Sequence, residues 1–66
     1  MKIEKVEQRR KDLHLTVGHM AEALGIDVST YYRKKQNNGE GFSALDLTVI
    51  KRELHLNEKE ALDFLL

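Results

Sequence analysis

The stretch TVGHMAEALGIDVSTYYRKKQ, residues 16–36, decides the fold that we expect for this chain. Ala21 is small enough for a close crossing of two helices, and Gly25 accepts the left-handed backbone that ends a helix. Ile26 follows as an apolar anchor, and the aromatic Tyr31 lies beyond it. This spacing predicts two helices joined by a tight turn, a helix-turn-helix, with the second helix held outward.

Length and composition set the class of protein. The chain has 66 residues and no cysteine, so we expect a single domain, residues 1–66, with one modest core. Neither disulfides nor thiolate zinc sites are possible without cysteine, and a reducing cytoplasm fits this composition best. The charged N-terminus has no apolar run like that of a signal peptide, and no segment resembles a membrane span. We therefore expect a soluble cytoplasmic protein with no membrane partner.

Helical signals predict five helices and therefore an all-α, compact bundle. The first helix runs from about residue 3 to residue 13. Its inner side is expected to carry three apolar residues, Ile3, Val6 and Leu13. Arg9 and Arg10 fall on the opposite side and are expected in solvent.

The second and third helices are bounded by local signals. Thr16 is a good N-cap for the second helix, which Gly25 ends. The residues that this helix is expected to bury follow helical spacing, Val17, Met20, Ala21 and Leu24. Asp27 is expected to cap the third helix, and Ile26 and Tyr31 then occupy the two positions of a hydrophobic staple.

Residues 37–41, NNGEG, read as a loop because asparagine and glycine favour turns. Ser43 with Asp46, and Asn57 with Glu60, then have the spacing of capping boxes that start the fourth and fifth helices. The fourth helix is expected to present an apolar surface made of Leu45, Leu47, Val49, Ile50 and Leu54. The fifth helix ends the chain with more large apolar groups than one short helix buries, so we expect a homodimer formed through Phe64, Leu65 and Leu66.

The net charge is zero, which by itself argues against a nucleic-acid-binding protein. The charges are unevenly distributed, however. Residues 1–36 carry eight Lys and Arg against five Asp and Glu, whereas residues 37–66 carry three against six. The half with the predicted helix-turn-helix is thus basic, and the triplet of residues 33–35, RKK, falls within the outward helix. We interpret this charge as a DNA contact, and the alternative is a solvated helix face.

Projecting the third helix at about 3.6 residues per turn places five residues on one outward stripe, Val28, Ser29, Tyr32, Arg33 and Gln36. These are the candidates for reading double-stranded DNA in the major groove. Arg33 is the strongest, because a guanidinium can hold O6 and N7 of guanine or a phosphate; the alternative is a surface ion pair. For Tyr32 the alternative is packing in the core. Thr30 and Lys35 complete the DNA contacts that we expect from this helix.

The chain resembles Cro and CI type phage repressors, the lambda-repressor-like (XRE-type) helix-turn-helix proteins with five helices. The resemblance covers nearly the whole chain, at Thr16, Ala21, Leu24-Gly25-Ile26, Ser29-Thr30-Tyr31, Arg33, Phe42-Ser43, Leu54, Leu56 and Glu60. The run STYYRKK, followed by an Asn/Gly loop and a phenylalanine, is similar to small repressors of phages and prophages in Gram-positive bacteria. The resemblance implies a transcriptional regulator that binds a pseudo-palindromic operator as a dimer.

Two positions depart from the family pattern. Val17 stands where many relatives have glutamine, so binding of a phosphate near Thr16 must use backbone amides at the start of the second helix. Val28 stands where relatives often have arginine or glutamine, and its only base-specific contact is with a thymine methyl group. These departures leave open a second function, a protein-interaction module, such as an antitoxin or antirepressor, that docks through its C-terminal helix.

No pattern predicts an enzyme. Serine, histidine and aspartate are present, but no nucleophile elbow, glycine-rich phosphate loop or carboxylate pair gives them a catalytic context. His14 and His19 lie across a helix boundary and have no third ligand at metal spacing. We therefore expect no metal, no cofactor and no small-molecule substrate.

Overall fold

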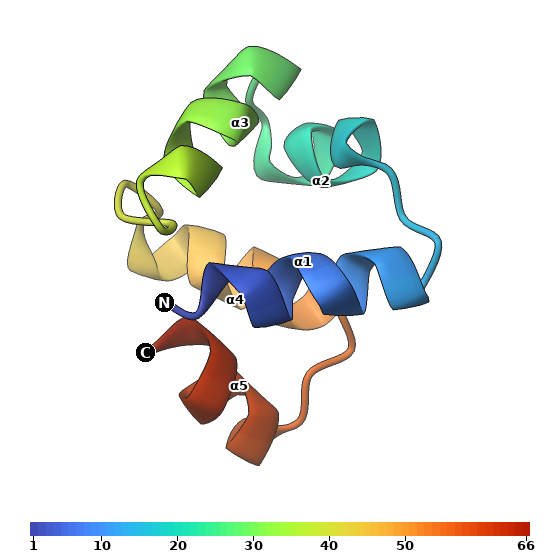
Figure 1. Ribbon diagram of the computed structural model, residues 1–66, viewed down its shortest axis with the longest axis vertical. Coiled ribbons are helices and arrows are strands. Elements are labelled where there is room, and N and C mark those ends of the chain that lie inside the picture. Colours follow the sequence, from blue (N-terminus) through green and yellow to red (C-terminus); the bar gives the residue numbers. More distant parts are fainter.

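The computed structural model describes residues 1–66 and contains five helices and no strand (Figure 1). In chain order these are α1 (Ile3–Asp12), α2 (Val17–Leu24), α3 (Val28–Gln36), α4 (Ala44–Glu53) and α5 (Glu58–Leu65). The prediction of an all-α chain with five helices is confirmed. The longest helices have ten residues, which is about half of what crossing a bilayer requires.

The helices are arranged in two groups that share one core. Helix α2 packs against α3 and α4, and α1 packs against α5, so that α3 and α5 lie at opposite ends of the molecule (Figure 1). The two ends of the chain meet beside α1, where the Lys2 amide donates to the Phe64 carbonyl at 2.8 Å. The whole molecule measures 29 × 23 × 19 Å.

Nine apolar residues form the core, drawn from all five helices and the turn after α4: Ile3, Val6, Met20, Ala21, Tyr31, Ile50, Leu54, Leu56 and Leu65. Tyr31 is its largest fully buried side chain, and its ring lies 6.1 Å from that of Phe42. Val17 and Leu24, predicted to be buried, pack against this core while remaining partly exposed. Leu45 is 74% exposed, so its predicted place on the inner surface of α4 is wrong.

The predicted capping boxes start α4 and α5. The Asp46 amide donates to Ser43 Oγ at 3.1 Å, and the Ser43 amide donates back to Asp46 Oδ2 at 3.0 Å. The Glu60 amide donates to Asn57 Oδ1 at 2.7 Å, and the Asn57 amide donates to Glu60 Oε1 at 3.1 Å. Each box satisfies two backbone donors that a helix start leaves free, which fixes where the two helices begin.

The starts of α2 and α3 differ from one another. Thr16 caps α2 as predicted, because its Oγ1 accepts a hydrogen bond from the His19 amide at 3.0 Å. Asp27 occupies the N-cap position of α3, but its side chain accepts no hydrogen bond there, so the predicted side-chain cap is wrong. The start of α3 is fixed instead by the turn before it and by burial of Tyr31.

Each of the first four helices is followed by a residue in the left-handed region. After α2 this residue is Gly25, with φ of 70°, and the Ile26 amide then donates back to the Ala21 carbonyl at 3.0 Å. After the other three helices it is a non-glycine residue with φ between 53° and 58°, namely His14, Asn38 and His55, and Gly39, with φ of 75°, follows Asn38. Two of the three histidines are therefore helix-ending residues, and no glycine signals their turns.

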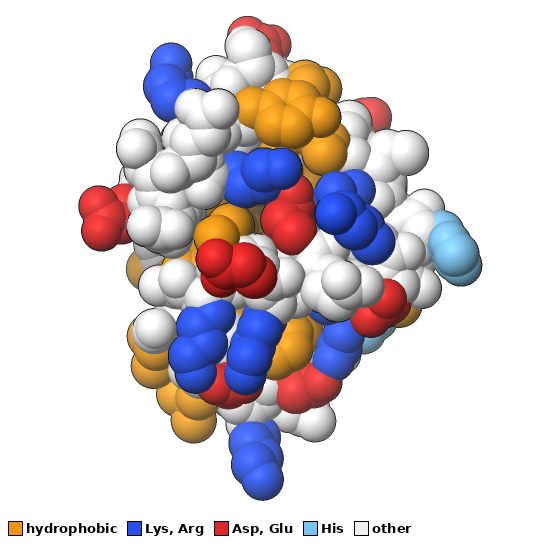
Figure 2. Space-filling view, viewed as in Figure 1, with side chains coloured by type: hydrophobic (Ala, Val, Ile, Leu, Met, Phe, Trp, Pro, Cys, Tyr) orange, Lys and Arg blue, Asp and Glu red, His pale blue; other side chains and the backbone are white.

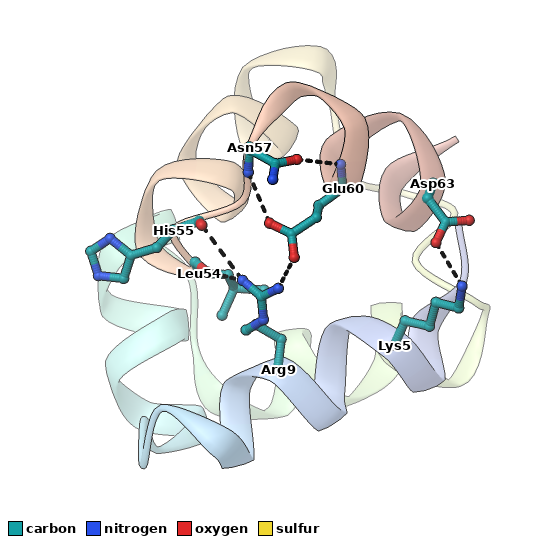
Figure 3. Close-up of polar contacts among 7 residues, drawn as sticks. All are labelled: Lys5, Arg9, Leu54, His55, Asn57, Glu60 and Asp63. Atoms are coloured by element: carbon teal, nitrogen blue, oxygen red, sulfur yellow. Dashed lines mark hydrogen bonds and ion pairs between the residues drawn. The ribbon is translucent and has the colours of Figure 1, made fainter.

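Arg9 and Arg10 are not in solvent, which corrects the prediction for the outer side of α1. Arg10 is only 9% exposed; its guanidinium donates to Glu7 Oε2 and to the Leu15 carbonyl, both at 2.7 Å. The Arg9 guanidinium turns toward the end of α4 and the start of α5 (Figure 3). Long arginine stems cover apolar surface while their charged ends bond to carbonyls and carboxylates. The spacing of apolar residues along a helix does not predict such burial of an arginine.

An ion-pair cluster joins α1 to α5 beside Arg9. Asp63 accepts from Lys5 Nζ at 2.6 Å and pairs with Lys2 as well (Figure 3). The hydrogen bonds from Lys2 and Lys5 lower the pKa of Asp63 to about 2. In Glu60, the Asn57 amide and the Arg9 side chain likewise hold the pKa of the carboxyl below its ordinary value.

We expect acid to loosen the contact between α1 and α5. A carboxyl whose pKa is lower in the folded than in the unfolded state stabilises the fold at neutral pH, and this stabilisation is lost as pH falls through the folded value. For Asp63 the window runs from the ordinary 3.8 down to about 2. Thermal melts across this window should show the melting temperature of Asp63→Asn falling less steeply with acid than that of the parent. Equal slopes would show that the pairs with Asp63 do not stabilise the fold.

Candidate nucleic-acid interface

The outer side of α3 is an exposed surface whose side chains have no hydrogen-bond partner within the protein. All five residues of the predicted outward stripe are exposed, Val28, Ser29, Tyr32, Arg33 and Gln36. None of their side chains makes a hydrogen bond within the protein. Tyr32 is 44% exposed whereas Tyr31 is 2% exposed, which confirms the predicted register of the helix.

Three contacts hold α3 in this orientation. The turn of residues 25–27 reverses the chain through the left-handed Gly25, and Ile26 packs partly buried against the core. Tyr31 is inserted on the inner side of α3, and its hydroxyl donates to Glu7 Oε2 on α1 at 3.1 Å. With its inner side anchored on α1 and α2, the helix leaves its opposite side for a partner.

The basic residues of α3 are not equally available. Arg33 makes no ion pair, so the alternative of a surface ion pair is not what the structure shows. Lys34 Nζ donates to the Gly41 carbonyl at 2.9 Å and lies over the Phe42 ring. Lys35 Nζ lies 3.1 Å from Glu7 Oε1 and 5.1 Å from the centre of the Tyr32 ring. In the free protein, therefore, Arg33 is the one unengaged cation of the triplet, and Lys35, expected to contact DNA, is paired with Glu7.

The start of α2 contributes less side-chain surface than predicted. Thr16 is exposed, with its Oγ1 engaged by the His19 amide. Val17 is partly buried against the core, so its side chain is not part of an outward contact surface. The amides of the first helical residues, Val17 and Gly18, have no acceptor within the helix and remain the donors that α2 offers to an anion. Thr30, on the third helix, is half-buried and only partly accessible.

Two acidic residues, Glu7 and Glu53, support α2 and α3, and no sequence pattern predicts either role. Glu7 is 8% exposed on the inner side of α1 and contacts Arg10, Tyr31 and Lys35. Glu53, at the end of α4, accepts from His19 Nε2 at 2.6 Å, and this bond lowers the pKa of Glu53 below its ordinary value. The contacts of Glu7 with Tyr31 and Lys35, and that of Glu53 with His19, join residues far apart in the sequence, so no local pattern marks them.

The apolar C-terminus is divided between the core and the surface, which corrects the predicted dimer contact. Leu65 is 9% exposed and belongs to the core. Phe64 is half-buried beneath the Arg9 guanidinium, which lies 5.5 Å from the centre of the Phe64 ring. Leu66 is 74% exposed as predicted, and Leu62, which precedes it by one helical turn, is 62% exposed. Figure 2 shows hydrophobic side chains at the surface at this end of the molecule.

A shallow groove of about 230 Å³ lies between α4 and α5 beside these leucines. Its apolar lining includes Leu47, Ala61 and Leu65, and Leu62 and Leu66 form its outer wall. An ion pair between Lys51 and Glu58 closes its other side. The groove beside α5 and the outward stripe of α3 lie toward opposite ends of the molecule (Figure 1). A partner bound in the groove would therefore leave the outward stripe accessible to a second partner.

Comparisons of the chain with protein-family models, with curated proteins and with solved structures give no match. No group of three or more His, Cys, Asp or Glu side chains is placed to hold a metal ion. The outward stripe of α3 and the α4–α5 groove are therefore the features of this molecule that indicate a function.

Proposed function

We propose that this chain is a sequence-specific DNA-binding protein in which α2 and α3 form a helix-turn-helix and α3 enters the major groove. Within that class we propose a Cro/CI-like transcriptional regulator of a phage or prophage, acting in the bacterial cytoplasm. It would occupy a pseudo-palindromic operator with one copy of α3 in each half-site. Catalysis, a cofactor and a small-molecule substrate have no part in this proposal.

The outward stripe of α3 is the observation that carries the proposal. Base edges in the major groove are read by side chains whose hydrogen-bonding groups are free, and Ser29, Arg33 and Gln36 keep theirs free. Val28, 43% exposed, supplies an apolar contact of the kind that a thymine methyl group accepts. Contact with solvent alone does not account for an exposed valine and an exposed tyrosine on the same side of one helix.

Arg33→Ala tests the proposal most simply. We expect operator affinity to fall by about 1–3 kcal/mol, because one guanidinium contact to a base or phosphate is lost. The melting temperature should stay nearly unchanged, since Arg33 has no internal partner. Arg52→Ala is the matched control, because Arg52 is also exposed but lies on α4. Equal affinities of the two variants for the selected duplex would contradict the proposed DNA contact.

We further propose that the protein forms a homodimer through the α4–α5 groove and the exposed leucines beside it. Leu62 lies on α5, Leu66 follows the end of this helix four residues later, and Leu45 adds a third exposed leucine on α4. The groove carries one lysine and one glutamate, so this surface has no net charge to repel a second copy of itself. Two linked copies of α3 would gain avidity for a two-half-site operator.

Leu62→Glu should give a monomer in sedimentation at concentrations where the parent is a dimer. A charge at this position opposes an apolar contact but not the fold, because Leu62 is 62% exposed. Deleting the last three residues is a poorer test, because it also removes the buried Leu65. Lys59→Glu, on the same helix, controls for added negative charge. A parent protein that stays monomeric at high micromolar concentration, with or without DNA, would reject the homodimer.

The second candidate function is a protein-interaction module on the same fold. The observation in its favour is the exposed apolar surface of Leu45, Leu62 and Leu66, together with the zero net charge of the chain. Such a module would bind a protein tightly through the α4–α5 groove and would bind DNA weakly or not at all. Loss of a protein partner in Leu62→Glu, with no affinity for DNA in the parent, would favour this function.

A further inference from the structure

We propose that Lys35 changes partner when the protein binds DNA, leaving the Glu7 carboxylate for a backbone phosphate, so that Glu7 restrains the affinity of α3. The proposal rests on the DNA-binding function proposed above. Its starting point is the position of Lys35 Nζ, 3.1 Å from Glu7 Oε1 on α1 and 5.1 Å from the centre of the Tyr32 ring on the outward stripe. The ammonium thus already lies between an internal acid and the candidate interface.

Glu7 does not depend on Lys35 for its charge to be balanced. Its Oε2 accepts from Arg10 Nε at 2.7 Å and from the Tyr31 hydroxyl at 3.1 Å. Burial raises the pKa of Glu7. The hydrogen bonds and charge of Arg10, together with the contacts of Lys35 and Tyr31, outweigh this effect of burial and hold the pKa below its ordinary value. A carboxylate that keeps a buried guanidinium and a hydroxyl as partners can lose a third partner without being left unpaired.

The contact of Lys35 with Glu7 lies at the surface. The ammonium is 3.1 Å from Oε1, the Lys35 side chain is 32% exposed, and Oε1 has no other partner. Lys35 lies at the edge of a surface hollow of about 360 Å³ between α1 and α3, which Ile3 and Lys11 also line. Figure 2 looks toward α1 and α3 and shows acidic and basic side chains next to one another there. Water from this hollow can take the place of the ammonium at Oε1.

Lys35 is placed to reach a phosphate once released. It follows Tyr32 by three residues and Val28 by seven, so on a helix it lies at the α1 edge of the outward stripe. A helix in the major groove is flanked on each side by the sugar-phosphate backbone, and residues at its edges make the phosphate contacts. The flexible lysine stem allows the ammonium to turn from Glu7 to such a phosphate without movement of α3.

The test compares Lys35→Gln, Glu7→Gln and the double variant with the parent on a duplex selected by the parent. Lys35→Gln should bind more weakly, and the slope of log affinity against log salt should be shallower by about 0.9, the value for one phosphate contact. Glu7→Gln should bind about 2- to 5-fold more tightly with an unchanged slope, the range expected for releasing an ion pair with one partly exposed partner. The double variant should behave like Lys35→Gln, because Glu7 acts only through Lys35.

Lys59→Gln, on α5 at the far end of the molecule from α3, serves as the matched control and should leave the slope unchanged. The proposal would be overturned if log affinity of Lys35→Gln fell with log salt as steeply as that of the parent. It would also be overturned if the higher affinity of Glu7→Gln persisted in the double variant. If Glu7→Gln does not fold, the slope of log affinity against log salt in Lys35→Gln still shows whether Lys35 binds a phosphate. If the parent selects no duplex at all, the proposed function fails first, and that outcome is distinct from a Lys35 that binds no phosphate.

Discussion

Tyr31→Ala should unfold much of the protein at room temperature. Tyr31 is 2% exposed, its ring packs near Phe42, and its hydroxyl donates to the buried Glu7. Deleting a buried aromatic side chain costs about 3–5 kcal/mol, whereas a chain of this size has about 3–10 kcal/mol of stability in all. Thermal melts followed by circular dichroism measure the loss. Tyr31→Phe, which keeps the ring, should lose clearly less than the alanine variant.

The neighbouring Tyr32→Ala should give the opposite result. Because Tyr32 is 44% exposed, its removal should hardly change the melting temperature. Operator affinity should fall by about 1–3 kcal/mol if the ring or hydroxyl meets DNA. An early melt for Tyr32→Ala together with a stable Tyr31→Ala would mean that the orientation of α3 is wrong by one residue, and every outward assignment would change with it.

Arg9→Met should destabilise the protein more than any other substitution of an arginine or lysine outside the Glu7 cluster. Its guanidinium donates to the Leu54 carbonyl at 3.1 Å and to the His55 carbonyl at 3.5 Å, and it pairs with Glu60 (Figure 3). One side chain therefore joins α1 to the end of α4 and to the start of α5. Hydrogen bonds of a charged group typically contribute about 1.5–3 kcal/mol, and urea unfolding should show a loss within this range.

Methionine is the informative replacement for Arg9 because it keeps an apolar stem over the ring of Phe64 while removing the charge. Arg52→Met is the control, since the Arg52 side chain is 67% exposed and pairs only with its neighbour Glu53. A loss in Arg9→Met no greater than in Arg52→Met would show that the three-helix contact adds nothing to stability. DNA binding by the folded fraction should be unaffected, because the partners of Arg9 lie at the end of α4 and the start of α5 and not on α3.

Where the sequence predicted the structure correctly, the signal was local. The capping boxes at Ser43 and Asn57 and the left-handed Gly25 each depend on residues within about one turn of each other, and all three are present. The orientation of Tyr31 and Tyr32 followed from helical spacing once the start of α3 was known. Local geometry was therefore sufficient to predict the elements and the outward stripe.

Where the sequence-based prediction failed, the deciding contact was one that apolar periodicity does not represent. Arg10 was placed in solvent because periodicity ignores a guanidinium that donates to Glu7, three residues before it, and to the Leu15 carbonyl, five residues after it. Lys35 was expected to contact DNA, and nothing in the sequence of α3 shows that α1 places a carboxylate beside it. Leu65 was expected at a dimer contact and lies in the core instead, because the direction of α5 depends on its packing against α1.

The most direct measurement is selection of duplexes from a random pool by the full-length protein, followed by affinity measurements between about 50 and 200 mM salt. The structure and sequence predict a selected site with two related half-sites. Binding to it should be stronger than to a scrambled duplex, and log affinity should fall linearly with log salt. Failure to enrich any sequence, or an affinity that is the same for scrambled DNA and insensitive to salt, would contradict a DNA-reading role for α3.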